Sequence, residues 1–220
     1  SNLVQYVDDH SDYNDWVELH NAGASSVSLT GYYLSDDTLV PMKWKIPAGQ
    51  TITANGFKRF WCDGRDSSTS TNPHTNFKLT QTKGTAEHIV LSDPLGVIID
   101  YVVLNSANRT QLGHSRGRYP NGSANWYIYT TPSPNATNAV GNYIAYAAKP
   151  LFDVAAGFYP STVTVTITNM EPNSTVYYTT TGNLPTTTST AYSAPVTISS
   201  TKILKAYAVS TNPQILPGFI

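Results

Sequence analysis

The chain has 220 residues, of which 40% are hydrophobic and 11% aromatic, so it can bury a core and is not intrinsically disordered. Charged residues make up only 12%, and the net charge of −1 lacks the basic excess that duplex binding requires, so nucleic acid is not an expected partner. No apolar run reaches the length of a membrane span. The single cysteine, Cys62, excludes an internal disulfide, and we expect it to be a small buried residue in a strand.

Short strand patterns follow one another through the first part of the chain. Helical spacing of apolar residues is missing, whereas runs of β-branched and aromatic residues are frequent. We expect strands at residues 16–20, 57–62, 88–91 and 97–103. Turn signals such as Asn55-Gly56 and Asp93-Pro94-Leu95-Gly96 separate them.

The last part of the chain is richer in threonine and has its own strands. Residues 163–168 alternate apolar and polar side chains, and we expect further strands at 196–198 and 203–208. The proline-rich stretch 131–138 cannot form a central strand. We therefore expect an all-β chain of two β-sandwiches, with domains at 1–138 and 150–220 and a linker at 139–149.

An acidic stretch near the N-terminus is a candidate metal site. Calcium prefers six to eight oxygen ligands, several of them from carboxylates. The candidate ligands are Asp8, Asp9, Asp12 and Asp15. The stretch lacks the glycine and the terminal glutamate of an EF-hand loop, so a solvated, hydrogen-bonded loop without an ion is the alternative. No other cofactor is expected.

A basic and aromatic loop is the candidate ligand-binding site. Its candidate residues are Arg109, His114, Arg116, Arg118 and Tyr119. Arginine stacks on aromatic rings and forms paired hydrogen bonds with carboxylates, so an acidic glycan or a partner loop would suit these side chains. The alternative is structural, with Arg118 anchoring a turn and Trp126 filling the core.

Catalytic patterns are weak throughout the sequence, and we expect no enzymatic activity. A phosphate-binding glycine loop and kinase signatures are missing. The five histidines show no metal-ligand spacing of the zinc type. Serine, histidine and aspartate are present, but a triad could be drawn from most chains of this composition.

Residues 1 to about 138 resemble the lamin-tail domain in its bacterial form. The motifs that carry the resemblance are Asn14–Asn21 (NDWVELHN), Leu29–Asp36 (LTGYYLSD), Trp44–Gly49 (WKIPAG), Asn76–Leu79 (NFKL), Gly117–Gly122 (GRYPNG), Trp126 and Thr131-Pro132. The chain departs from the family at His20, where tyrosine is common, and at Ser133-Pro134-Asn135, which replaces a Pro-Gly ending. The resemblance implies an immunoglobulin-like β-sandwich.

Residues 150–220 resemble the small β-sandwich domain at the C-terminus of chitobiase and β-hexosaminidase enzymes. The motifs that carry this resemblance are Gly157-Phe158-Tyr159, Val176–Thr179 (VYYT), Gly182–Thr186 (GNLPT), Tyr192, Pro195 and Ile203–Ala206 (ILKA). Thr181 stands where the family often has aspartate. Domains of this kind accompany catalytic domains and are not themselves catalytic.

Together the two resemblances imply a non-catalytic pair of domains that docks or positions a neighbouring domain at a bacterial surface. In similar bacterial proteins the pair often precedes a kinase-like domain of the CotH type. The implied location is extracytoplasmic, secreted or at the cell surface, and the partner is a neighbouring domain or another surface protein. The alternative is a carbohydrate-binding module for surface or dietary glycans.

The resemblances also imply that both sandwiches lack an edge strand. The first strand of the lamin-tail family should precede Ser1-Asn2, and the last strand of the second domain should follow Ile220. A sandwich that lacks an edge strand exposes unpaired backbone groups. We expect another segment or a neighbouring chain to fill the slot, so an unpaired edge in the structure would contradict this expectation.

Overall fold

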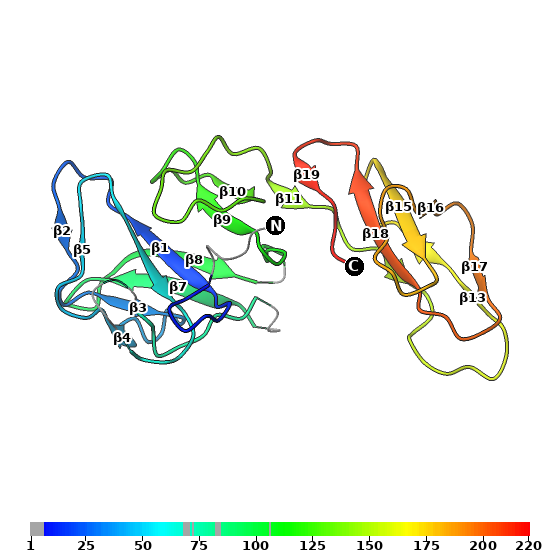
Figure 1. Ribbon diagram of the computed structural model, residues 1–220, viewed down its shortest axis with the longest axis horizontal. Helices are drawn as coiled ribbons and strands as arrows, with labels where there is room; N and C mark the ends of the chain where they lie inside the picture. Colours follow the sequence, from blue (N-terminus) through cyan, green and yellow to red (C-terminus); the bar gives the residue numbers. More distant parts are fainter. Residues whose placement is uncertain (1–6, 68–70, 72, 82–84, 106) are drawn as a thin grey trace. The chain divides into compact units, whose positions relative to one another are not determined.

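The computed structural model describes residues 7–67, 71, 73–81, 85–105 and 107–220. It divides into two compact units, Ser1–Gly141 and Asn142–Ile220, which are called unit 1 and unit 2 below. Regular structure in the described residues consists of β-strands (Figure 1), which confirms the predicted all-β class of two immunoglobulin-like sandwiches. No described helix is long and apolar enough to cross a membrane.

The described residues of unit 1 form ten strands. They are β1 (Trp16–His20), β2 (Val27–Ser28), β3 (Tyr33–Ser35), β4 (Trp44–Lys45), β5 (Thr51–Ile52), β6 (Phe57–Trp61), β7 (Glu87–Ser92), β8 (Ile98–Leu104), β9 (Ser115–Arg118) and β10 (Trp126–Tyr129). The largest sheet has the order β4-β3-β7-β8, and the pairs β1-β6, β2-β5 and β9-β10 complete the unit. All of these pairs are antiparallel.

The core of unit 1 lies between the β4-β3-β7-β8 sheet and the β1-β6 pair. Buried side chains come from both layers, and Phe60 is completely inaccessible to solvent. The core residues are Val17, Leu29, Leu34, Trp44, Ile46, Ile52, Phe60, Cys62 and Phe77. Burial of these large side chains is the main stabilising contribution to the unit. Cys62 is buried and has no disulfide partner, as the sequence predicts.

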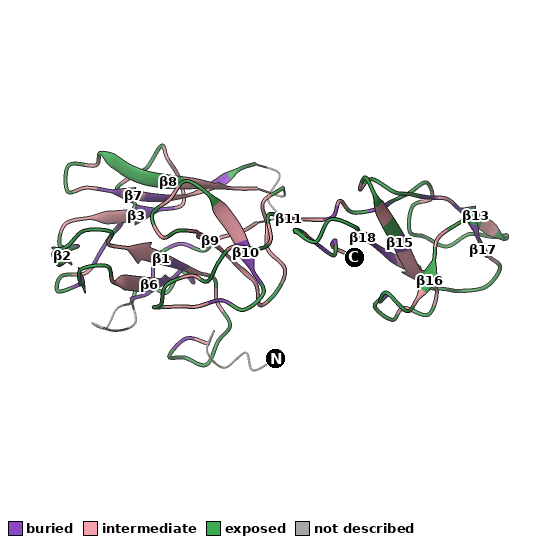
Figure 2. Ribbon diagram, turned by 90° about the horizontal axis from the view of Figure 1, so that it is seen from above, coloured by how far each residue is buried: buried purple, intermediate pink, exposed green. Residues whose placement is uncertain are grey.

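The predicted turn between β7 and β8 shows how local sequence positions these strands. The Asp93 carboxylate accepts hydrogen bonds from the backbone N–H groups of Leu95 and Val97, both at 2.9 Å. Gly96 adopts a φ of 83°, a left-handed conformation that glycine takes without steric cost. The turn closes the β7-β8 hairpin and leaves β8 as the outer strand of its sheet, largely exposed in Figure 2.

Unit 2 contains the remaining nine strands. They are β11 (Ala145–Tyr146), β12 (Leu151–Phe152), β13 (Val163–Val165), β14 (Ile167–Thr168), β15 (Ser174–Thr179), β16 (Thr190–Ala191), β17 (Val196–Ile198), β18 (Lys205–Ser210) and β19 (Ile215–Leu216). The central sheet has the order β16-β15-β18. The core residues are Ala147, Ile167, Val176, Val196, Ala206 and Ala208.

The division between the two units lies inside the predicted linker, but the second part of that linker belongs to unit 2. The division falls between Gly141 and Asn142, inside the predicted linker of 139–149. The second part of that linker is not a free connection, because β11 pairs in parallel with β19 and the Ala147 N–H donates to the Leu216 carbonyl at 2.8 Å. Small side chains and a partner strand far along the chain hide this strand from local pattern analysis.

Candidate functional site

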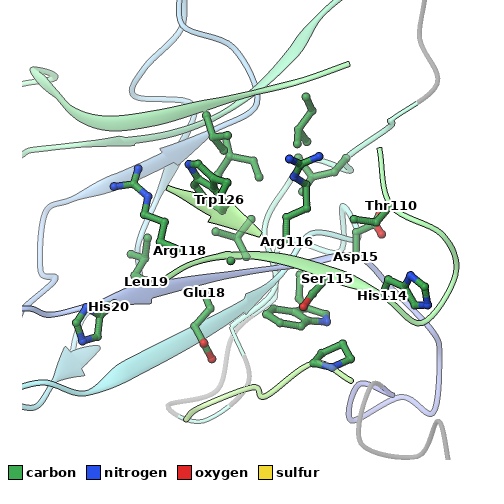
Figure 3. A pocket seen from close by; sticks show the side chains of 18 of the residues that line it. Asp15, Glu18, Leu19, His20, Thr110, His114, Ser115, Arg116, Arg118 and Trp126 are labelled. Atoms are coloured by element: carbon green, nitrogen blue, oxygen red, sulfur yellow. The ribbon is translucent and has the colours of Figure 1, made fainter. Parts of the chain in front are cut away.

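A groove of about 670 Å³ opens in unit 1 beside β1. Its lining comes from β1 on one side, from β7 and β8 on another, and from the β9-β10 hairpin and its flanking loops. Figure 3 shows side chains of β1, of the β9-β10 hairpin and of the loop before it around the same space. The groove is therefore built by segments that are far apart in the sequence.

The floor of the groove is apolar and continuous with the core of unit 1. Leu19, Ile89 and Leu91 are only partly buried and pack against the core cluster, and all three also line the groove. Leu34 lies at the bottom and is 1% exposed. The groove is thus a gap in the cover of the hydrophobic core, and an apolar occupant would gain free energy by removing this surface from water.

One edge of β1 borders the groove and has no partner strand among the described residues. The Cys62 N–H donates to the Asp15 carbonyl at 2.8 Å, and the Asn21 N–H donates to the Gly56 carbonyl at 3.0 Å. In this register, the backbone groups of every second residue from Asp15 to Asn21 point towards β6. In an antiparallel ladder the intervening residues direct their backbone groups to the opposite edge. These are Trp16, Glu18 and His20, and no hydrogen bond within the described residues reaches their backbone groups.

This edge bears on the expected slot of a missing strand, which stays a prediction. The resemblance implies that the slot of a missing strand is filled, whereas no described segment of this chain pairs with the groove side of β1. Ser1-Asn2, where the first family strand should adjoin, lie outside the described residues. The open edge is a row of unpaired donors and acceptors, and such a row is a template for another strand.

The β9-β10 hairpin supplies the polar wall of the groove. Arg118 donates to both carboxylate oxygens of Asp100 on β8, each at 2.8 Å, and its guanidinium lies 5.0 Å from the centre of the Trp126 ring. Figure 3 shows Arg118 beside Trp126. Arg116 donates to the Asn108 carbonyl at 3.1 Å. Arg118 therefore fastens the hairpin to β8, and Arg116 fastens it to the loop after β8. Trp126 is half-buried at the groove rather than deep in the core.

Three of the five predicted ligand-binding residues line the groove. They are His114, Arg116 and Arg118, whereas Arg109 and Tyr119 do not belong to the lining. Burial lowers the pKa of His114, which favours its neutral form. The prediction of binding residues in this loop stays a prediction. The structural alternative gave Arg118 a turn to anchor, whereas its carboxylate partner Asp100 lies in strand β8.

Two carboxyl groups at the groove are shifted towards their neutral forms. Burial raises the pKa of Asp15, and the nearby Glu87 carboxylate raises it further. Burial also raises the pKa of Glu18, although the Asn135 N–H at 2.5 Å and the charge of Arg59 partly offset the shift. The Glu18 bond ties β1 to the segment after β10, so this carboxylate has a structural partner.

A second polar feature of unit 1 gathers around Arg65, outside the groove. The Arg65 guanidinium donates to Asp8 at 2.6 Å and to Asp63 at 2.7 Å, and it also pairs with Asp12. Burial alone would raise the pKa of Asp8. Hydrogen bonds from the backbone of Asp12 and His10 and from the side chains of Asn14 and Arg65 outweigh this and lower its pKa to about 2.

His74 extends this cluster towards the surface. Its Nδ1 lies 2.8 Å from the Asp63 carboxylate, and its Nε2 lies 2.9 Å from the Asp9 carboxylate. The His10 ring meets the His74 ring edge-on at 5.5 Å. The side chain of His74 is 2% exposed, so both of its nitrogens depend on these carboxylates for hydrogen bonding.

The predicted calcium ligands do not form one group. Arg65 takes the place of a cation between Asp8 and Asp12, and Asp15 lines the groove instead. Among the described residues, the groups whose ligand atoms converge closely enough for a metal ion are Asp9, His10 and His74, and Asp8, Asp63 and His74. Sequence reasoning missed Arg65 and His74, because they join the acidic stretch only through contacts across more than 50 residues.

Family models match a part of each unit. Residues 3–106 match the Lamin Tail Domain, and residues 154–214 match the Chitobiase/beta-hexosaminidase C-terminal domain. Both are immunoglobulin-like domains of a non-catalytic type, and their order is the predicted tandem. Neither the search of curated proteins nor the search of solved structures gave a match.

Proposed function

Because the chain joins a lamin tail domain to a chitobiase/β-hexosaminidase C-terminal domain, we propose that it is a non-catalytic binding module that docks a neighbouring protein segment in the groove beside β1. The observation that carries the proposal is the unpaired edge of β1, where the backbone groups of Trp16, Glu18 and His20 face an apolar groove.

The expected occupant is an extended polypeptide segment that adds as a strand next to β1. In strand addition, main-chain hydrogen bonds provide affinity and alternate side chains provide specificity. Side chains on one face of the added strand would contact Leu19, Ile89 and Leu91, so we expect apolar residues at every second position of the occupant. Its other side chains would meet Arg116 and Glu18 at the rim.

The low content of charged residues and the second unit support an extracytoplasmic location. Domains of the chitobiase C-terminal family are typically extracellular. We propose that the docked segment belongs to a neighbouring domain or another surface protein, and a CotH-type kinase-like domain is the candidate neighbour. The pair of modules would then hold that domain at the surface.

The test uses a random twelve-residue peptide library displayed on phage, selected against the full chain. Proline in place of Glu18 removes a backbone N–H that points to the groove and leaves the β1-β6 hydrogen bonds intact, because proline is tolerated on edge positions. Glu18→Gln is the matched control, since it also alters the carboxylate but keeps the N–H. We expect selected peptides to bind the wild type and the Gln variant and to lose at least tenfold affinity for the Pro variant.

Equal affinity for the two variants would contradict strand addition at β1. Failure of the library to yield any binder would also count against the groove as a peptide site. Circular dichroism of both variants checks that the fold is kept, so that loss of binding is not read from an unfolded chain.

Carbohydrate binding is the second candidate, and one observation favours it. Tyr13 and Tyr101 are exposed residues that line the groove, and the half-buried Trp126 belongs to the same lining. Aromatic rings offer an apolar face and, in tyrosine and tryptophan, a polar edge, both of which suit sugars. A glycan array with calcium and with chelator distinguishes the candidates. Selective binding that Tyr101→Ala abolishes would favour the carbohydrate module over strand docking.

A further inference from the structure

Both ring nitrogens of His74 face carboxylates. A carboxylate can only accept hydrogen bonds, and His74 has one carboxylate on each ring nitrogen, Asp63 at 2.8 Å and Asp9 at 2.9 Å. A neutral imidazole donates from one nitrogen only. If Nδ1 donates to the buried Asp63, the lone pair of Nε2 faces the negative charge of Asp9. A positive species must therefore lie between Nε2 and Asp9, and it is either a proton or a metal ion.

A third ligand faces the same point. His10 Nε2 lies 3.8 Å from the Asp9 oxygen that contacts His74, and the ligand atoms of Asp9, His10 and His74 all lie within 4.8 Å of one another. Ligand atoms of a tetrahedral zinc site, with bonds of about 2.0–2.2 Å, are about 3.4 Å apart. The observed separations of 2.9 and 3.8 Å lie on both sides of that value.

We propose that Asp9, His10 and His74 form a binding site for a zinc-like divalent transition-metal ion. Two imidazole nitrogens and one carboxylate suit zinc and similar late first-row ions, whereas calcium prefers oxygen ligands. Asp9 and His10 are exposed and His74 is buried, so the site is open to solvent on one side. Three protein ligands leave a fourth position for water or for a group from a partner.

The surroundings of His74 are those of a metal-bound histidine. Metal-ligating histidines usually donate their second ring N–H to a carboxylate, which fixes the tautomer and aims the other nitrogen at the metal. Asp63 fills this role, and Arg65 holds Asp63 in place at 2.7 Å. Charge also favours a cation, because four carboxylates, Asp8, Asp9, Asp12 and Asp63, gather around Arg65 and His74.

The proposed ion would join two segments of unit 1 that are far apart in the sequence. Asp9 and His10 belong to the loop that leads into β1, and His74 follows β6 and forms a parallel bridge with Trp61. An ion that binds the folded chain and not the unfolded chain stabilises it by mass action. Zinc is therefore expected to raise the unfolding temperature of unit 1.

The test measures zinc binding to the full chain without a polyhistidine tag, by isothermal titration calorimetry, with Co²⁺ as a spectroscopic probe of coordination. We expect one ion per chain, Co²⁺ d–d absorption typical of a four-coordinate site, and no comparable response to Ca²⁺. His10→Ala and Asp9→Asn change exposed ligands and should fold normally, and each should weaken zinc binding at least tenfold. His88→Gln is the control, because His88 lies in unit 1 outside the cluster.

Asp63→Asn tests the orienting carboxylate. It leaves all three ligands in place, and loss of an orienting partner typically weakens metal binding about 10–100-fold. Two results would overturn the proposal. Absence of zinc binding to the wild type would assign a proton to the space between His74 and Asp9. Wild-type affinity in both His10→Ala and Asp9→Asn would place any bound zinc elsewhere.

Discussion

The two units use the same fold class but differ in how polar groups contribute. Unit 1 concentrates its charge in specific contacts, such as Arg65 with Asp8 and Asp63, and it carries the groove with an unpaired strand edge. The charged residues of unit 2 are Lys149, Asp153, Glu171, Lys202 and Lys205. Both candidate binding features, the groove and the cluster around His74, lie in unit 1.

Unit 2 replaces charge pairs with hydroxyl and amide hydrogen bonds. Ser174 Oγ donates to the Glu171 carbonyl at 2.7 Å, and the Thr179 hydroxyl donates to the Asn183 carbonyl at 2.6 Å. Its core contains three alanines and lacks the large aromatic residues that fill unit 1. Unit 2 therefore combines a small core with strands and turns that satisfy one another's polar groups.

The largest expected effect comes from Phe60, a fully buried large side chain of the unit 1 core. Phe60→Ala should lower the free energy of unfolding of unit 1 by about 3–5 kcal/mol, because it removes a buried ring and leaves a cavity. All four tryptophans lie in unit 1, so urea unfolding followed by tryptophan fluorescence reports this unit directly. An unchanged midpoint would contradict the assigned core.

The matching change in unit 2 is Ile167→Ala. Ile167 is 2% exposed, and its truncation should cost unit 2 about 2–4 kcal/mol. Differential scanning calorimetry should show a lower transition for unit 2, whereas the tryptophan signal of unit 1 should keep its midpoint. A shift of the tryptophan midpoint by the same amount would contradict two separate cores.

Acid should weaken unit 1 through its carboxylate cluster. The pKa of Asp8 is lowered to about 2 in the folded state, from an ordinary value of 3.8, and hydrogen bonds to Arg65 and His74 also lower the pKa of Asp63 against the effect of burial. A lowered folded-state pKa contributes stability that is complete above the unfolded value and is lost as the pH falls through the folded value. The tryptophan-detected midpoint in urea should therefore fall between about pH 4 and pH 2.

The control for this pH dependence is Asp8→Asn, which removes one of the shifted carboxyl groups. The variant should be less stable than the wild type at pH 6 and should lose less stability on acidification. An identical pH dependence in the two proteins would show that Asp8 does not carry the effect.

The smallest effect concerns the reactivity of Cys62. Burial raises the pKa of this thiol, and the Asp15, Asp63 and Asp36 carboxylates raise it further against a hydrogen bond with Thr75. Since the thiolate is the reactive form, the folded chain should react very slowly with Ellman's reagent, and the rate should rise when urea unfolds unit 1. Rapid labelling of the folded chain would contradict the burial of Cys62.

Local pattern predicted most of the fold and part of the site. Alternation at 163–168 and the aspartate turn before β8 act over a few residues, so their strands were predictable. β11 was not, because Ala145–Tyr146 has no distinctive pattern and its partner β19 lies about 70 residues away. Sequence separation also decides which site residues could be predicted. His114 and Arg118 are close together in the sequence, whereas the pairing of His74 with Asp9 depends on the tertiary fold.

The most direct test of the docking account is amide hydrogen exchange along β1, measured by NMR in the free chain and with a selected peptide. In the free chain, the N–H groups of Trp16, Glu18 and His20 should exchange fast and those of Val17 and Leu19 slowly, since only the latter point towards β6. The peptide should protect the first three and leave the others unchanged. Protection of all five in the free chain, or no change at Trp16, Glu18 and His20 on peptide binding, would contradict strand addition at this edge.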